Sequence, residues 1–137
     1  MRQRVVRIMR PYDAVSVENR AYPGTADVNY VEGWVELKWM PRWPRGCEID
    51  PVRVKHFTPQ QRVWLRRRWR RGGNVYLLLQ AGQDWLLFAG DVAADLLGKV
   101  PRPVLVENAL AHWKGLNEQE LKTWLTGIWR SSPRVSD

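Results

Sequence analysis

The chain has 137 residues, 45% of them hydrophobic and nine of them tryptophan, which excludes an intrinsically disordered protein and favours one folded domain. Lysine and arginine number 22 against 14 acidic residues, and a net charge of +8 suits a protein that meets nucleic acid. No apolar run is long enough to cross a bilayer, and no signal peptide is evident. The single cysteine, Cys47, excludes an internal disulfide and a zinc site built from several cysteines. We therefore expect a cytoplasmic protein.

In chain order, the first half of the sequence predicts a short helix, three strands and a long loop. These are a helix over 2–9, strands over 14–19, 26–31 and 34–39, and a loop over 40–57. The YPGT segment at 22–25 separates the first two strands as a turn or a tight backbone passage. The loop contains three prolines and no helical period.

The second half predicts a long helix, two strands and further helices. The elements are a helix over 58–73, strands over 74–81 and 84–89, a short helix over 90–98 and a last helix over 117–129. Thr58 and Pro59 open the long helix and two glycines close it, while Asn117 and Glu120 have capping-box spacing. We therefore predict one α/β domain over 1–130, with a central mixed five-stranded sheet flanked by helices, an extra C-terminal helix and a frayed tail at 131–137.

The hairpin formed by the second and third strands brings polar residues to one face. If Glu32-Gly33 is a two-residue turn, Val31 pairs with Trp34 and alternation of side chains decides the rest. One face then carries Asp27, Asn29, Glu36 and Lys38, and the other carries Val28, Tyr30, Val35, Leu37 and Trp39 as core. In this register Asp27 and Glu36 are diagonal neighbours, close enough to share one ion.

Two converging carboxylates are suited to a hard divalent cation, and Mg²⁺ or Mn²⁺ is the expected choice. A lysine on the same face adds positive charge, so the set suits hydrolysis of a phosphodiester. The alternative for Glu36 and Lys38 alone is a solvated strand face with a weak charge pair.

Three ordered signals carry a family resemblance. VENR-x-YPGTAD is followed by WVELK and then by T-x-x-Q-x-x-W, from about Ser16 to Phe88. This combination resembles the PD-(D/E)xK nuclease superfamily, and within it the stand-alone VRR-NUC and phage Holliday-junction-resolvase-like nucleases. The resemblance implies a restriction-endonuclease-like core. Ala26 stands where the superfamily has the proline of its name, a residue that shapes backbone and supplies no ligand.

Carried over by position, the resemblance implies that Asp27 and Glu36 are metal ligands, joined by the backbone carbonyl of Leu37. Lys38 becomes the catalytic lysine, and Gln61 matches the glutamine on the helix that follows. Relatives often have one more upstream glutamate. Here that residue is Glu18, which either reaches a metal or pairs with Arg20 and takes no part in catalysis.

The helix over 58–73 has a packed face and a basic face. Gln61, Trp64, Leu65, Arg68 and Trp69 follow the spacing of a packed face, whereas Arg62, Arg66 and Arg70 lie opposite, with Arg67 and Arg71 beside them. A solvated basic face accounts for part of this pattern, and we expect some of these arginines to contact the DNA backbone. Arg68, on the packed face, is expected to pair with an acid or stack on a tryptophan.

The loop after the third strand interleaves Trp39 and Trp43 with Arg42 and Arg45. Such aromatic residues either stack on an unpaired base, with the arginines contacting DNA, or fasten the loop to the body of the protein. His56 and His112 have no partners at metal-ligand spacing and are expected to be structural.

The sequence thus predicts a Mg²⁺- or Mn²⁺-dependent endonuclease that acts on branched, Holliday-junction or otherwise distorted DNA. A homodimer is expected, with Trp124 and Trp129 as a candidate interface. The alternatives are a non-catalytic DNA-binding module that retains the fold, and an RNA- or protein-binding domain in which the acids are incidental. The resemblance to phage nucleases and the small size suggest a phage- or prophage-encoded protein acting in the bacterial cytoplasm.

Overall fold

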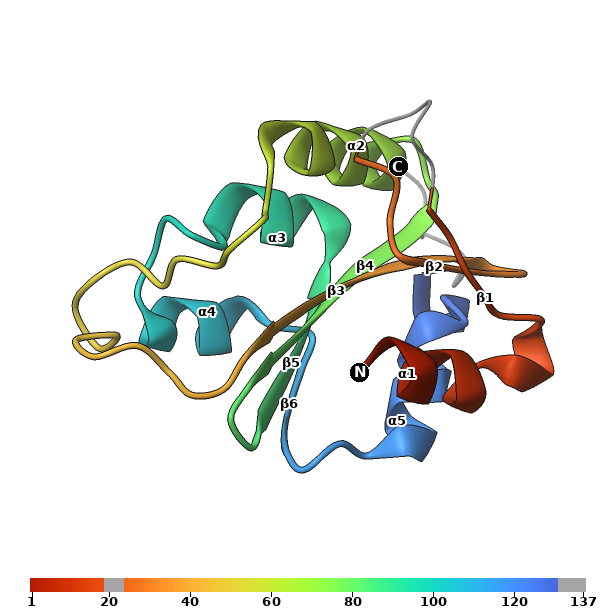
Figure 1. Ribbon diagram of the computed structural model, residues 1–137. Coiled ribbons are helices and arrows are strands. Elements are labelled where there is room, and N and C mark those ends of the chain that lie inside the picture. Colours follow the sequence, from red (N-terminus) through yellow and green to blue (C-terminus); the bar gives the residue numbers. More distant parts are fainter. Residues whose placement is uncertain (19–23, 131–137) are drawn as a thin grey trace.

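The computed structural model describes residues 1–18 and 24–130 (Figure 1). Within these ranges the helices are α1 (Arg2–Ile8), α2 (Pro59–Arg70), α3 (Gly90–Leu96), α4 (Arg102–Asn108) and α5 (Glu118–Leu125), with short 3-10 turns at Arg10–Tyr12 and Ile128–Arg130. The strands are β1 (Val15–Ser16), β2 (Val28–Tyr30), β3 (Gly33–Met40), β4 (Asn74–Ala81), β5 (Asp84–Ala89) and β6 (Ala111–Lys114). The predicted tail at 131–137 lies outside the described residues. No helix in the described ranges is long and apolar enough to span a membrane.

The strands form one mixed sheet in chain order, β1 to β6, in which β3 and β4 are parallel and every other described pair is antiparallel. The predicted α/β class is confirmed, but the predicted number of five strands is wrong, because the described residues form six. The added strand, β6, is only four residues long and takes its conformation from pairing with β5. Helix α4 was also missed, since it is only seven residues long and begins after Pro101, without a side-chain cap.

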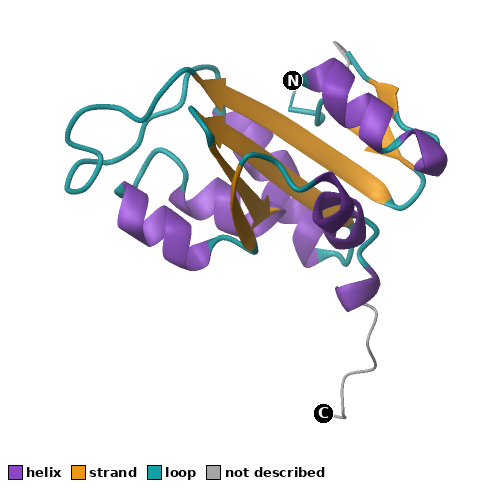
Figure 2. Ribbon diagram, turned by 90° about the horizontal axis from the view of Figure 1, so that it is seen from below, coloured by secondary structure: helices purple, strands orange, loops and turns teal. Residues whose placement is uncertain are grey.

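Helices cover both faces of the sheet (Figures 1 and 2). Helices α2, α3 and α4 pack on one face, where Trp64, Leu65, Ala93, Leu97 and Leu105 meet Leu77, Leu79 and Phe88. Helices α1 and α5 pack on the other, where Val5, Ile8, Leu121 and Leu125 meet Tyr30, Tyr76, Leu78 and Leu87. Strand β4 is therefore buried on both faces, as its apolar run predicted.

The β2–β3 hairpin has a different register from the predicted one. Tyr30, not Val31, pairs with the next strand, opposite Gly33, so that Val31 and Glu32 form the turn. Gly33 is required inside β3 rather than in the turn, because a Cβ there would collide with the Asn74 carbonyl. The shift is even, so each residue keeps its predicted face, and the register, if continued, places Asp27 opposite Glu36 instead of Lys38.

Strand β2 pairs only with residues 33–35, so the carboxyl half of β3 has an edge that β2 does not cover. Val28, Tyr30 and Val35 are buried as predicted. Trp39, which was predicted to belong to the core, is 59% exposed, because β3 extends well past the end of β2.

Candidate active site

Asp27 lies at the uncovered edge of β3, one residue before β2 begins. Its Oδ2 accepts the backbone N–H of Leu37 at 2.9 Å and so replaces the missing strand partner. Because the N–H and C=O of one residue point to the same side of a strand, the Leu37 carbonyl faces this edge as well. The carboxylate of Asp27 and the Leu37 carbonyl therefore share one edge of the sheet.

Glu36 projects from β3 toward α2 and is 1% exposed. Its Oε2 accepts hydrogen bonds from Lys38 Nζ and Gln61 Nε2, each at 3.0 Å. Its Oε1 is buried without a hydrogen-bond partner among the described residues, a costly state for a carboxylate oxygen. Burial raises the pKa of Glu36 to about 7, repulsion from Asp27 adds to this effect, and the Lys38 ammonium opposes it.

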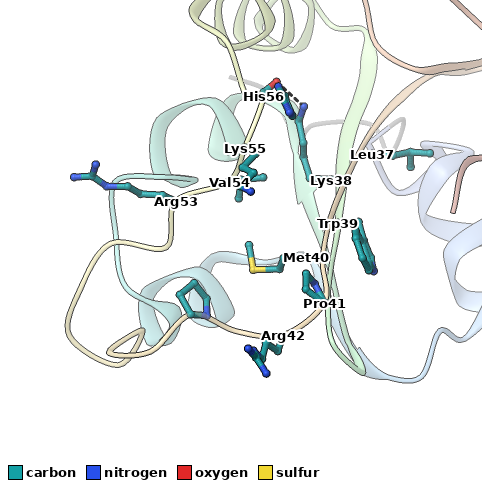
Figure 3. A pocket seen from close by; sticks show the side chains of 11 residues that line it. Leu37, Lys38, Trp39, Met40, Pro41, Arg42, Arg53, Val54, Lys55 and His56 are labelled. Atoms are coloured by element: carbon teal, nitrogen blue, oxygen red, sulfur yellow. Dashed lines mark hydrogen bonds between the residues drawn. The ribbon is translucent and has the colours of Figure 1, made fainter.

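Lys38 is held by three acceptors that leave its ammonium little freedom. Besides Glu36, the Nζ atom donates to Gln61 Oε1 at 3.2 Å and to the His56 carbonyl at 3.0 Å, the latter shown in Figure 3. His56 has a φ of 63°, a left-handed conformation that is rare for a residue other than glycine. This contact was not predicted, because His56 contributes its backbone carbonyl and not its side chain.

Gln61 enters the site from the first turn of α2, and this helix begins where the sequence predicted. Thr58 and Gln61 form a capping box, with Gln61 N–H to Thr58 Oγ1 at 3.2 Å and Thr58 N–H to Gln61 Oε1 at 3.0 Å. The segment before Asp27 lies against the same turn, since a Cβ at Gly24 would collide with the Gln60 carbonyl. This confirms a tight backbone passage at Gly24, while Tyr22 and Pro23 lie outside the described residues.

Glu18 is not in this cluster. Its side chain is 79% exposed, and its Oε1 lies 4.0 Å from Nη1 of Arg2. Arg2 in turn donates to Asp27 Oδ1 at 2.8 Å, so one guanidinium bridges the two acids. Arg20, the predicted alternative partner, lies outside the described residues. Arg2 itself was missed, because nothing in the local pattern of the first helix points to a contact 25 residues away.

Two of the arginines predicted to face DNA have partners in or beside α3. Arg62 donates to the Ala94 carbonyl at 2.9 Å, and Arg66 donates twice to Asp95, at 2.9 and 2.7 Å. Helix α3 thus covers part of the face that the helical pattern assigned to solvent. Arg67 and Arg70 are exposed. Arg68, predicted to lie on the packed face, is exposed, and of its two expected contacts the structure has the stacking, at 4.8 Å from the centre of the Trp64 ring.

The loop after β3 borders a pocket of about 470 Å³ that opens beside Lys38 (Figure 3). Its basic lining comes from Lys38, Arg42, Arg53 and Lys55. Arg45 is exposed on the same loop and is not among the lining residues.

Trp39, near the end of β3, and Trp43, in the loop, have different environments. Trp43 donates to Asp84 at 2.6 Å and lies beneath the Arg102 guanidinium, so it fastens the loop to the body. Trp39 also borders the pocket, but its ring lies on the opposite side of β3 from Lys38 and Met40 and is exposed there (Figure 3).

The tryptophans predicted to form a dimer interface pack within the chain. Trp124 and Trp129 are 5.4 Å apart between ring centres, and Trp129 also lies against Trp69 and Tyr76. The structure therefore gives these side chains a role in the monomer, and the homodimer stays a prediction.

Among the described residues, no three or more His, Cys, Asp or Glu side chains are grouped to hold a metal ion. The candidate site thus offers two carboxylates, from Asp27 and Glu36, and the carbonyl of Leu37. Comparison of the chain with protein-family models, with curated proteins and with solved structures gave no match.

Proposed function

We propose that this protein is a divalent-metal-dependent DNA endonuclease of the PD-(D/E)xK type, with a preference for branched or otherwise distorted DNA. One observation carries the proposal. Asp27, Glu36, Lys38 and Gln61, from three separate segments, gather at the uncovered edge of β3, where the last three are joined by hydrogen bonds. They are also the residues to which the family resemblance assigns the chemistry.

The donor set fits Mg²⁺ or Mn²⁺, which prefer oxygen ligands and keep several waters. Glu36 Oε1 is a buried acceptor without a hydrogen-bond partner in residues 1–18 and 24–130, and Asp27 and the Leu37 carbonyl face the adjoining edge. A metal bound there would supply a Lewis acid and an activated water.

The protein's own residues would position the substrate and stabilise charge. Lys38, held by Glu36, Gln61 and His56, presents an ammonium that can offset negative charge developing on a phosphate. Gln61 donates to Glu36 and accepts from Lys38, so it keeps both in one arrangement. The rigidity of this set favours a pre-arranged site over one that forms on binding.

The alternative is a DNA-binding module without catalysis, and one observation favours it. Each carboxylate already has a cationic partner, Arg2 for Asp27 and Lys38 for Glu36, so the cluster is balanced in charge without a metal. The two functions make different predictions about metal dependence.

Cleavage of labelled DNA separates them. We would incubate four-way junction, splayed-arm and linear duplex DNA with Mg²⁺, Mn²⁺ or EDTA, using wild type, Asp27→Asn and the exposed control Glu107→Gln. Metal-dependent cutting that Asp27→Asn loses and Glu107→Gln keeps supports the nuclease. Tight binding without cutting under any condition supports the binding module. Size measurement by light scattering, with and without junction DNA, tests the expected homodimer.

A further inference from the structure

A second basic pocket borders the candidate active site from the side of α1. It measures about 820 Å³ and is lined by Arg2, Gln3, Arg4, Val6, Arg7, Arg10 and Ser16. Four of these seven residues are arginines and none is acidic. The pattern of this segment, read as a short helix, did not single it out as a binding surface.

The arginines of this pocket keep much of their charge available. Glu118 pairs with Arg4 at 3.0 Å and with Arg7 at 3.5 Å, but the Arg7 side chain remains 59% exposed. Arg10 is exposed and forms no ion pair with an acid in the described part of the chain. One acid therefore partly neutralises two arginines and leaves the end of the pocket near Arg10 basic.

Both basic pockets touch the same cluster. Arg2 lines the α1 pocket and contacts Asp27, while Leu37 and Lys38 line the loop pocket and contact Asp27 and Glu36. The candidate site thus lies between two arginine- and lysine-lined hollows. A third basic pocket, lined by Arg67, Arg68, Arg71 and Gly73, shares no residue with the cluster.

We propose that the α1 pocket and the loop pocket form one track for the DNA backbone, with phosphates held by Arg7 and Arg10 on one side of the site and by Arg53 and Lys55 on the other. Arginine forks suit phosphate oxygens, and a continuous basic track follows a chain of phosphates. This inference rests on the proposed function, which makes the cluster between the two pockets an active site for DNA cleavage. The track, rather than the arginines of α2, is then the main DNA-contacting surface, because Arg62 and Arg66 donate hydrogen bonds to α3.

Three double variants, each removing two positive charges, test the track. They are Arg7→Ala/Arg10→Ala for the α1 pocket, Arg53→Ala/Lys55→Ala for the loop pocket, and Arg67→Ala/Arg71→Ala as the matched control. Affinity for fluorescent duplex and four-way junction DNA is measured by anisotropy in EDTA across a salt series. We expect each track variant to weaken binding about 10-fold or more and to lower the salt slope by about one to two, and the control to change affinity less than about 3-fold.

Equal weakening in all three variants, or a larger loss in the control, would overturn the track, as would a wild type that binds no DNA. Arg10→Ala alone guards against a folding defect, because Arg10 has no acidic partner among the residues that the structure describes, and it should weaken binding about 3-fold or more. The two proposals fail separately. If the wild type shows metal-dependent cleavage and both track variants bind DNA as tightly as the wild type, the track is wrong and the nuclease stands. If both track variants lose binding and the wild type cleaves no DNA, the track stands and the nuclease is wrong.

Discussion

The guanidinium of Arg2 lies 2.8 Å from the carboxylate of Asp27, although 25 residues separate them in the chain. A cation from α1 thus contacts the acid that is proposed to bind a metal, and the two must compete for the same oxygen. Arg2 also lines the α1 pocket, so this contact connects that pocket with the candidate active site.

We predict that Arg2→Ala binds Mn²⁺ more tightly than wild type, because Mn²⁺ then does not have to displace the Arg2 guanidinium from the Asp27 carboxylate. A partly exposed ion pair contributes about 0.2–1 kcal/mol, so the Kd should fall about 1.4- to 5-fold in a calorimetric titration. Arg7→Ala, which removes a charge from the same helix without touching Asp27, is the control. Unchanged or weaker Mn²⁺ binding by Arg2→Ala would contradict this competition.

Lys38→Met keeps much of the volume of the lysine and removes its ammonium. We expect cleavage to fall about 100- to 1,000-fold, since a positioned charge at a developing oxyanion contributes that much. DNA affinity in EDTA should change less than about 3-fold, because Lys38 is one charge among many along the track. Single-turnover rates at saturating protein measure the first effect and anisotropy the second. A proportional loss of affinity and rate would instead assign Lys38 to binding.

The capping box of α2 offers a matched pair. Thr58→Ala and Gln61→Ala each remove one half of it, and each should lower the free energy of unfolding by about 0.5–2 kcal/mol. Only Gln61→Ala also removes the contacts with Glu36 and Lys38. Cleavage should therefore fall at least about 10-fold in Gln61→Ala and remain near wild type in Thr58→Ala, with urea melts recording stability. Equal activity in the two variants would limit Gln61 to a capping role.

The Trp39 ring lies on the opposite side of β3 from Lys38, at the edge of the loop pocket (Figure 3), and Trp39 is 59% exposed, whereas Trp43 is tied to Asp84. A base stacked on an aromatic ring contributes about 1–3 kcal/mol, so Trp39→Ala should weaken binding of splayed-arm DNA by about 5- to 150-fold. Linear duplex, whose bases are already stacked, should be affected much less. Ile49→Ala, an exposed residue of the loop that follows β3 and one outside the pocket, is the control. The same loss on both substrates would show that Trp39 does not select unpaired bases.

Asp84 is buried at the end of the β4–β5 hairpin and joins four segments of the chain. Its carboxylate accepts from Trp43 at 2.6 Å, lies 2.9 Å from His112 and 3.2 Å from Lys114, and is 3.7 Å from Arg102. Burial by itself would raise the pKa of Asp84, but the hydrogen bonds from His112, Trp43 and Lys114 outweigh it and lower the pKa to about 2.

A lowered pKa means that the unfolded state binds the proton more readily. Wild type should therefore keep this stabilisation above about pH 4 and lose it as the pH falls toward 2. Asp84→Asn should be less stable at pH 7 by roughly 2 kcal/mol, and this difference should shrink toward pH 2. Chemical denaturation at several pH values, with Glu107→Gln as control, measures it. A difference that does not depend on pH would show that the charge of Asp84 contributes nothing.

Much of the candidate site was predictable from local rules. Strand alternation placed Asp27, Glu36 and Lys38 on one face, and an even error in the hairpin register left that face unchanged. The capping signals of α2 placed Gln61 on its inner side, because the start of a helix is decided by a few neighbouring residues.

Other features depended on contacts between distant segments. The sequence alone determined the α/β class, the strands that carry the acids and the helix that carries Gln61, since each follows from periodicity and capping within about ten residues. Only the tertiary structure decided that position 33 must be glycine, because a Cβ there would collide with the Asn74 carbonyl, and that β6 pairs with β5 at the edge of the sheet. The same is true of the contacts of α3 with Arg62 and Arg66 and of the contact of Arg2 with Asp27. These contacts depend on which surfaces meet when the helices pack on the sheet. The sequence pattern of a short segment does not identify the distant segment that it will contact.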